Sequence, residues 1–310
     1  MSKIVELNYH NQTLRINCRG GGIAEYYVEK DGRREDIVYG YCEESDYDGG
    51  MGDILSPFPG RVDKGEYTYN GEGYKLQGFE ENNGNPLHVF VRELEWQVAK
   101  TSDNQITSTL DVLVDKFAKN GYPFGLKYQI IYTLKVGGLH IKTVVKNTDE
   151  KIAPFGIGYH PYFSVAREVD EMVWKVPAES LVEFDQNLKP TGKIIPVNET
   201  DLDFREGGKI GNKEIDNCFT GLIRDENGIF TSTLSSKDGQ KVIEIWQNES
   251  YPYFQTYSAD TIDENNYRKA MALEPQSCCG YAINMPELGL VDLEPGSEFR
   301  GEWGINHHII

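Results

Sequence analysis

Hydrophobic and polar residues alternate along much of the chain, most clearly in the segment LKYQIIYTLKV at positions 126–136. Because successive side chains of a β-strand point to opposite faces, this alternation predicts a strand with one buried face. Gly137 and Gly138 follow, and LHIKTVVKN then alternates again, so two strands joined by a tight turn are expected. Six residues are expected on the buried face of the first strand: Leu126, Tyr128, Ile130, Tyr132, Leu134 and Val136.

The same arrangement recurs around three other glycine-containing dipeptides, namely Asp31-Gly32, Asn70-Gly71 and Asp238-Gly239. Each dipeptide lies between short alternating segments, which is typical of β-hairpins. No window combines a sustained helical period with capping residues at both ends. No proline- or serine-rich linker and no charge run divides the chain. We therefore predict an all-β protein with few short helices, in which residues 1–310 form one large antiparallel sandwich-type domain.

The composition of the chain argues against several classes of binding partner. The chain has 310 residues, 39% of them hydrophobic, and a net charge of −18, which argues against nucleic acid and anionic membranes. The N-terminal residues contain no long apolar run, so we expect neither a secretory signal nor a membrane span. The cysteines are odd in number and form no CxxC pair, which favours free thiols in the cytoplasm and argues against zinc. They are Cys18, Cys42, Cys218, Cys278 and Cys279.

Two of the six histidines lie in apolar and aromatic surroundings, His88 in NPLHVFVRE and His160 in GIGYHPYF. Pro161 disfavours a helical conformation of the residue before it, so His160 is expected in extended backbone. Either histidine could be a proton donor or acceptor in catalysis, or a structural residue with a backbone partner. The other four are expected in solvent, on a lysine-bearing strand face, at a turn or at a loose C-terminus: His140, His10, His307 and His308.

Three charged residues also stand in unusual surroundings. Glu274, in MALEPQSCCGYAIN, lies within an apolar run, where a carboxylate must be paired or functional because burying it alone is costly. Desolvation would raise its pKa and suit it to act as a general base, although a strand end facing water is the alternative. Asp216 has apolar neighbours but also begins an Asp-Asn pair that is typical of turns. Arg61 ends the rigid segment SPFPG and could bind a sugar hydroxyl, an anion or a neighbouring carboxylate.

The order of five segments resembles the aldose 1-epimerase (galactose mutarotase-like) family, and the resemblance covers nearly the whole chain. It implies a large β-supersandwich, a sugar site on one sheet, a small-molecule sugar substrate, no cofactor or metal, and a monomer or homodimer. The segments are LSPFPGRVDKGEYTYNGEGYKL, NPLHVFVRE, GIGYHPYF, IDNCFTG and ALEPQSCCGYAINMPE.

The resemblance also implies a role for each matching residue. Glu274 matches the general base that takes the proton from the anomeric hydroxyl, and His160 matches the general acid that protonates the ring oxygen. The ring then opens, the bond to C1 rotates, and closure gives the other anomer of the hexose. His88, Asp216 and Arg61 match residues that bind the sugar.

Two positions depart from galactose mutarotases and resemble a less characterised branch of the family. Those enzymes carry Gly-Gly after the first histidine, where Val89 stands here, and serine after the second, where Pro161 stands here. The identity of the sugar therefore stays open.

Arg92 resembles an arginine of hexose-6-phosphate epimerases. If Arg61 and Arg92 converge, the substrate could be a phosphorylated or otherwise anionic sugar. A non-catalytic carbohydrate-binding protein is a further alternative, but binding alone does not require an acid–base pair. A glycoside hydrolase would need a second carboxylate beside Glu274, and the sequence offers a histidine instead.

Overall fold

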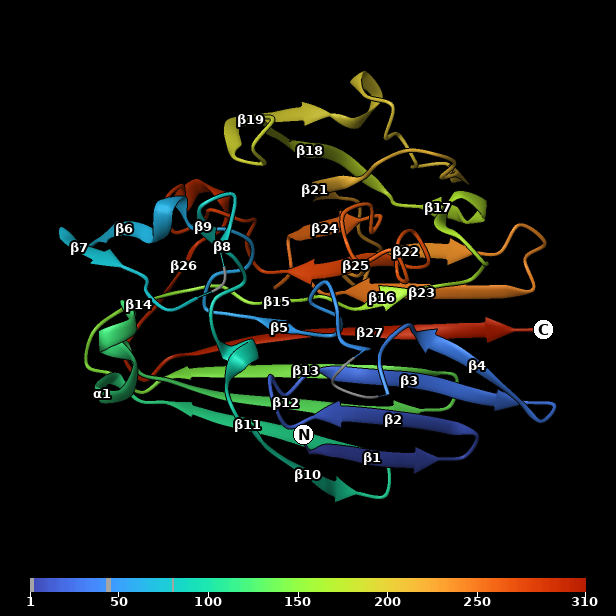
Figure 1. Ribbon diagram of the computed structural model, residues 1–310, viewed down its shortest axis with the longest axis horizontal. Helices are drawn as coiled ribbons and strands as arrows, with labels where there is room; N and C mark the ends of the chain where they lie inside the picture. The colour runs from blue at the N-terminus through green and yellow to red at the C-terminus, as the bar shows by residue number, and fades with distance from the viewer. Residues whose placement is uncertain (1–2, 43–45, 80) are drawn as a thin grey trace.

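Antiparallel β-strands dominate the computed structural model, which describes residues 3–42, 46–79 and 81–310 (Figure 1). Two large sheets carry most of these strands. In spatial order, the nine-stranded sheet contains β10 (Gln97–Ser102), β11 (Gln105–Val112), β12 (Leu126–Lys135), β13 (Gly138–Asn147), β27 (Glu298–Ile309), β23 (Lys241–Gln247), β22 (Phe230–Ser235), β17 (Val173–Lys175) and β20 (Gly208–Lys209). The eight-stranded sheet contains β19 (Pro190–Pro196), β18 (Ala178–Phe184), β21 (Asp216–Leu222), β24 (Tyr253–Tyr257), β25 (Met271–Gln276), β15 (Gly158–Tyr159) and β5 (Ile54–Leu55), with β16 (Tyr162–Phe163) also paired to β25.

Smaller elements surround the two large sheets. A four-stranded sheet is formed by β1 (Ile4–Tyr9), β2 (Gln12–Asn17), β3 (Ile23–Lys30) and β4 (Arg33–Val38). Three strand pairs are β6 (Glu66–Tyr69) with β7 (Glu72–Lys75), β8 (Glu81–Asn82) with β9 (Asn85–Pro86), and β14 (Ala153–Phe155) with β26 (Val291–Leu293). Helical segments within the described residues are short: α1 (Val114–Phe117), η2 (Asp63–Gly65), η3 (Val91–Glu93), η4 (Ala118–Asn120), η5 (Val169–Glu171), η6 (Val197–Glu199) and η7 (Pro286–Leu288).

The alternation of residue types predicted the longest hairpin correctly. Strands β12 and β13 pair in antiparallel register from Leu126 opposite Asn147 to Lys135 opposite Gly138, and the hydrophobic face of β12 is buried. The prediction was wrong for Val136, whose side chain is 85% exposed because the residue already belongs to the turn. The other three predicted hairpins are also present, as β3–β4, β6–β7 and β22–β23.

The two large sheets pack face to face through aromatic side chains. Tyr159 of β15 contacts Trp303 of β27 with ring centroids 4.9 Å apart, and its hydroxyl is hydrogen-bonded to Thr143 of β13. Tyr251 also donates a hydrogen bond to the Thr143 hydroxyl at 2.8 Å. Burying a large apolar side chain contributes roughly 1.5–3 kcal/mol to folding, so this layer of aromatic residues holds the sheets together.

Strand β27 changes the interpretation of the C-terminal segment. It pairs with β13 on one side and β23 on the other, so the expectation of a loose C-terminus around His307 was wrong. The His307 imidazole Nε2 instead lies 3.1 Å from the Tyr26 hydroxyl. His140 is only 22% exposed and lies 3.0 Å from Glu302, so it is less solvated than its lysine neighbours suggested. The five cysteines are free thiols, as expected.

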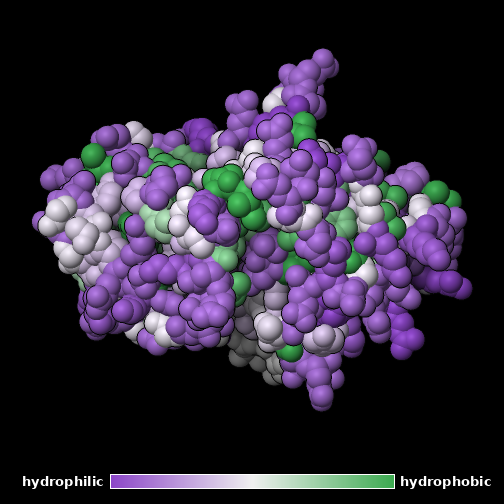
Figure 2. Space-filling model, turned by 90° about the horizontal axis from the view of Figure 1, so that it is seen from above, coloured by the Kyte–Doolittle hydropathy of each residue, from purple (hydrophilic) through white to green (hydrophobic). Residues whose placement is uncertain are grey.

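The surface agrees with the acidic, polar composition. Figure 2 shows a largely hydrophilic face on which hydrophobic residues form only small areas. In the part of the chain that the structure describes, no helix is long and apolar enough to cross a membrane.

Candidate active site

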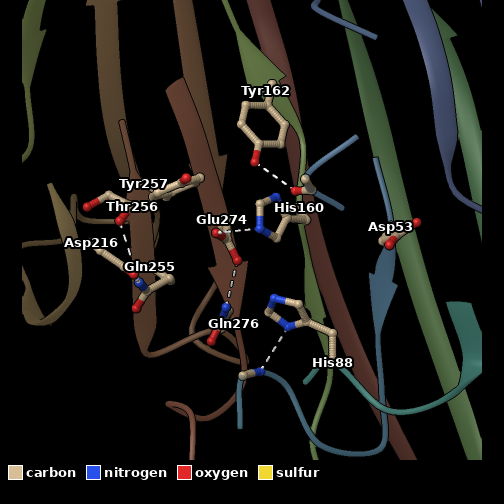
Figure 3. A network of polar contacts seen from close by, with 12 residues as sticks. Asp53, His88, His160, Tyr162, Asp216, Gln255, Thr256, Tyr257, Glu274 and Gln276 are labelled. Atoms are coloured by element: carbon tan, nitrogen blue, oxygen red, sulfur yellow. Dashed lines mark hydrogen bonds and ion pairs between the residues drawn. The ribbon is translucent and has the colours of Figure 1, made fainter. Parts of the chain in front are cut away.

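Four neighbouring strands in the middle of the eight-stranded sheet bring the candidate residues together (Figure 3). Strand β25 supplies Glu274, which lies opposite Gln255 of β24 in the strand register. Asp216 begins β21, which pairs with β24 on its other side. His160 follows β15, which pairs with β25. Residues separated by more than 100 positions in the chain thus meet on one face of the sheet because the antiparallel register aligns them.

Glu274 and His160 form a buried pair. The Glu274 Oε1 atom lies 3.3 Å from the His160 Nε2 atom, and the residues are 1% and 5% exposed. The Gln276 amide donates a hydrogen bond of 2.9 Å to the other carboxylate oxygen, Oε2. Burial raises the pKa of Glu274 well above its ordinary value, and the same cause lowers the pKa of His160 to about 3. Burial thus favours the uncharged form of both groups.

The backbone around His160 is fixed by two hydrogen bonds. The His160 N–H donates to the Asp53 carbonyl at 3.0 Å, and its carbonyl accepts from the Gly52 N–H at 2.9 Å. The imidazole stacks on Tyr162, whose hydroxyl donates to the Gly49 carbonyl. Tyr162 and the following Phe163 are fully buried, so they belong to the core. The His160 Nδ1 atom is buried and has no hydrogen-bond partner among the described residues.

His88 faces His160 from a different segment. Their rings meet edge to face, with centroids 5.4 Å apart. The Gly60 N–H donates to the His88 Nδ1 atom at 3.1 Å, so in the neutral ring the proton lies on Nε2. Burial keeps the pKa of His88 well below its ordinary value, and the positive charges of Arg92 and Arg61 act in the same direction. Its φ of +53° is uncommon for a residue other than glycine, and such strain gathers at functional sites.

Asp216 and Arg61 lie near one another at the same site. The Gln255 amide donates a 2.7 Å hydrogen bond to the Asp216 carboxylate. Burial raises the pKa of Asp216, and the positive charge of Arg61 partly opposes that rise. The Arg61 guanidinium donates through Nε and Nη2 to the Asn82 side-chain oxygen at 3.1 and 2.9 Å, so the β8–β9 hairpin fixes its direction. Asp216 begins a strand and does not form the turn that its sequence context also allowed.

Arg92 is paired with Asp53, the residue whose backbone carbonyl accepts the His160 N–H. Its Nη1 atom is 3.2 Å from the Asp53 carboxylate, and Asp53 lies beyond His160 from Glu274 in Figure 3. Burial lowers the pKa of both His88 and His160, and the positive charge of Arg92 acts in the same direction. Arg92 also lines a cavity of about 130 Å³ with Asn17, Arg19, Tyr41, Tyr47, Asp53 and Glu93. The two arginines therefore have different partners, Asn82 for Arg61 and the acidic Asp53 for Arg92.

Three residues of this arrangement were not identified from the sequence: Gln255, Gln276 and Asn82. Gln276 had a usable signal, since it follows Glu274 by two positions and residues two apart on a strand share a face. Gln255 and Asn82 act across strands or hairpins, and only the register or tertiary contacts reveal them.

Comparisons with known proteins agree with this fold. The family model described as aldose 1-epimerase matches residues 3–306. The chain is 29% identical to the uncharacterized protein YihR of Escherichia coli (strain K12), over 81% of this chain and 77% of that protein. It is 26% identical to the galactose mutarotase of Sus scrofa, over 96% of this chain and 92% of that protein.

The fold also matches a solved structure, the crystal structure of a GalM/aldose epimerase homologue from C. elegans. The TM-score is 0.86, the identity is 20%, and both chains are covered completely. Because the family model spans almost every residue, the chain belongs to the aldose 1-epimerase family and is an isomerase of the mutarotase type.

Proposed function

We propose that the protein interconverts the α and β anomers of a free aldohexose by acid–base catalysed opening and closure of the sugar ring. The observation that carries this proposal is the buried pair of Glu274 and His160, with Oε1 and Nε2 only 3.3 Å apart. Mutarotation requires that one proton leave the anomeric oxygen and another reach the ring oxygen. A carboxylate and an imidazolium on adjacent strands supply these two transfers.

The proton count of the pair fits the reaction. In the ring-opening step, the anomeric hydroxyl gives its proton to the Glu274 carboxylate while the His160 imidazolium protonates the ring oxygen. The bond between C1 and the ring oxygen breaks as the C1 carbonyl forms, and Glu274 and His160 both end uncharged. Burial favours these uncharged forms, so it favours the proton transfers of ring opening and opposes those of ring closure. After rotation at C1, the reverse transfers close the ring and restore the charges.

The surrounding side chains offer hydrogen bonds of both kinds to sugar hydroxyls. The neutral His88 ring presents Nε2–H as a donor, because Nδ1 already accepts from Gly60. Asp216 presents carboxylate oxygens, and Arg61 presents guanidinium donors directed by Asn82. Holding the sugar so that both reacting oxygens meet their partners adds to the acid–base effect. The name galactose mutarotase of the relative from Sus scrofa supports the same reaction class.

The test measures anomer exchange by NMR on the wild type and on the Glu274→Gln and His160→Asn variants. Each substitution should lower the rate by roughly 10²–10⁴-fold, the usual contribution of a positioned acid or base. Circular dichroism should show an unchanged fold. Near-wild-type rates in either variant would contradict the assigned roles. A wild type that binds sugars but exchanges no anomers would point instead to a carbohydrate-binding protein.

A second candidate is the same reaction on an anionic sugar such as a hexose 6-phosphate. The observation in its favour is that the charges of both Arg61 and Arg92 act on His88. Against it, the Asp53 carboxylate lies against Arg92 and offsets its charge. A panel of free and 6-phosphorylated hexoses decides between the two. A kcat/KM that is higher for the phosphorylated sugars and falls steeply with salt would favour the anionic substrate.

A further inference from the structure

The Glu274 carboxylate has two different oxygen atoms in the folded protein. One oxygen, Oε1, faces His160 at 3.3 Å, and the other, Oε2, accepts the Gln276 amide hydrogen bond at 2.9 Å. Gln276 is 2% exposed, so its amide has little access to water as an alternative partner. Figure 3 shows the amide directed at Glu274 on the side away from Tyr162. The orientation of the carboxylate thus depends on one buried neutral donor.

We propose that Gln276 is a positioning residue for the reaction proposed above. Its amide holds Oε2 so that Oε1 stays directed toward His160 and the anomeric hydroxyl. This inference rests on the proposed function of Glu274 as the base. The residues two apart on β25 share one face of the strand, and this is how the amide reaches the carboxylate.

Gly158 provides the space that Gln276 needs. The two residues are opposite one another in the pairing of β15 with β25. A Cβ atom at Gly158 would lie 2.8 Å from the Cγ atom of Gln276 and 3.3 Å from its Cδ atom. Gly158 does not have a positive φ, so the required feature of this glycine is its lack of a side chain. The absence of a side chain at Gly158 therefore leaves room for the Gln276 side chain beside Glu274.

The hydrogen bond also affects how readily Glu274 ionises. Burial opposes ionisation, whereas donation from Gln276 stabilises the charged form and lowers the pKa of Glu274. Without the amide, the carboxylate should hold its proton to higher pH. A smaller share of the enzyme would then have the ionised Glu274 with a protonated His160 that ring opening requires.

Three variants test the inference. Gln276→Met keeps the length of the side chain but removes the hydrogen-bond donor. Gly158→Ala should displace Gln276 without changing its amide group, and the third variant combines both changes. The matched control is Gln247→Met. Gln247 is an equally buried glutamine whose amide donates to the Tyr251 and Tyr253 carbonyls and not to Glu274.

We expect Gln276→Met to lower kcat by about 10-fold or more, with KM within about 3-fold, because hydrogen bonds to charged groups are the stronger ones. The Glu274 titration, followed by carboxyl ¹³C NMR, should move to higher pH by about one unit. The limb of the pH–rate profile that disappears in Glu274→Gln should move with it. Gly158→Ala should act in the same direction, and the double variant should be no slower than Gln276→Met alone. Gln247→Met should lower thermal stability without moving the titration.

An unmoved Glu274 titration in folded Gln276→Met would overturn the inference. If Gln276→Met does not fold, an unmoved Glu274 titration in Gly158→Ala would also overturn the inference. Losses in kcat that simply add in the double variant would overturn it as well. The NMR titration requires no catalysis. A wild type without anomer exchange would therefore contradict the proposed function, while the titration would still decide whether Gln276 governs Glu274.

Discussion

Tyr159 and His160 are neighbours in the chain but project into two different buried environments. Tyr159 points into the layer between the two large sheets, where it meets Thr143 and Trp303. His160 lies at the outer face of the same sheet, beside Glu274. The two side chains are buried almost equally, at 3% and 5% exposed. Their surroundings differ in the kind of polar group that they contain: hydroxyls around Tyr159 and a titratable carboxyl group beside His160.

The hydroxyl groups around Thr143 are neutral and mutually hydrogen-bonded. Tyr159 and Tyr251 both reach the Thr143 hydroxyl, so these groups avoid the cost of burial without partners. At the His160 face, the His160 Nδ1 atom lacks a hydrogen-bond partner among the described residues. The titratable side chains of His160 and Glu274 are buried there beside one another. The comparison teaches that neutral, mutually hydrogen-bonded hydroxyls stabilise the fold around Thr143, whereas a buried pair of titratable groups marks the face where chemistry is proposed.

The largest effect should come from replacing either member of the Glu274–His160 pair. Glu274→Gln and His160→Asn should each slow anomer exchange by roughly 10²–10⁴-fold, because each removes one of two linked proton transfers. The double variant should be about as slow as the slower single variant, since neither group completes the reaction alone. Anomer exchange followed by NMR or polarimetry measures all three rates. Multiplying losses in the double variant would mean that the two residues act independently.

The next largest effect should be on the pH dependence of stability, which we expect to change at the His160 face and not at the Tyr159 face. The pKa of Glu274 is raised in the folded state, so the folded protein binds more protons than the unfolded chain above about pH 4.5. Stability should therefore fall as pH rises from there through the folded pKa, on the order of 1.4 kcal/mol for each unit of pKa shift. Glu274→Gln removes this loss and should be increasingly more stable than the wild type as pH rises.

Urea unfolding of the two proteins between pH 4.5 and 8 provides the measurement. Tyr159→Phe should show no such widening gap, because burial keeps the pKa of the Tyr159 hydroxyl above its ordinary value and it stays protonated throughout this range. A constant difference between Glu274→Gln and the wild type would contradict the raised pKa of Glu274.

Local pattern was sufficient to predict much of the fold. Alternating residues and Gly-containing turns identified the long β12–β13 hairpin and three shorter ones, because each arises from neighbouring residues. Strands β5 and β15 contain only two residues each, too few to show alternation, yet β15 carries the chain into His160. Val136 was misassigned because alternation alone does not mark where a strand gives way to its turn.

The candidate site was predicted in part. Glu274 and His160 stood out because ionisable residues in apolar segments are unusual, and the family resemblance grouped them with His88, Asp216 and Arg61. Gln276 was missed although its spacing of two residues from Glu274 was a usable signal, because a neutral amide does not stand out by residue type. Asn82 was missed because its contact with Arg61 is tertiary and no local pattern encodes it.

Replacing Thr143 tests whether the inner polar cluster is structural. Thr143→Val keeps the shape of the side chain but leaves the Tyr159 and Tyr251 hydroxyls without their shared partner. The cost should be about 1–3 kcal/mol in the free energy of unfolding, the penalty for a buried polar group that loses its hydrogen bond. Urea unfolding measures this loss, and anomer exchange should remain within about 3-fold of the wild type when the protein is folded. A rate loss comparable to that of His160→Asn would mean that the hydroxyl cluster around Thr143 contributes to catalysis as well as to stability.

The smallest effect should come from Tyr159→Phe, which removes one hydroxyl and leaves the Tyr251–Thr143 hydrogen bond in place. A net loss of about 1 kcal/mol is expected, because the aromatic contact with Trp303 persists. The position of His160 should not change, since its backbone is held by Asp53 and Gly52 and not by the Tyr159 side chain. Anomer exchange and its pH profile should therefore match the wild type. A shifted profile would show that the inner cluster tunes the adjacent imidazole, and the two faces of this strand would then have to be treated as one functional unit.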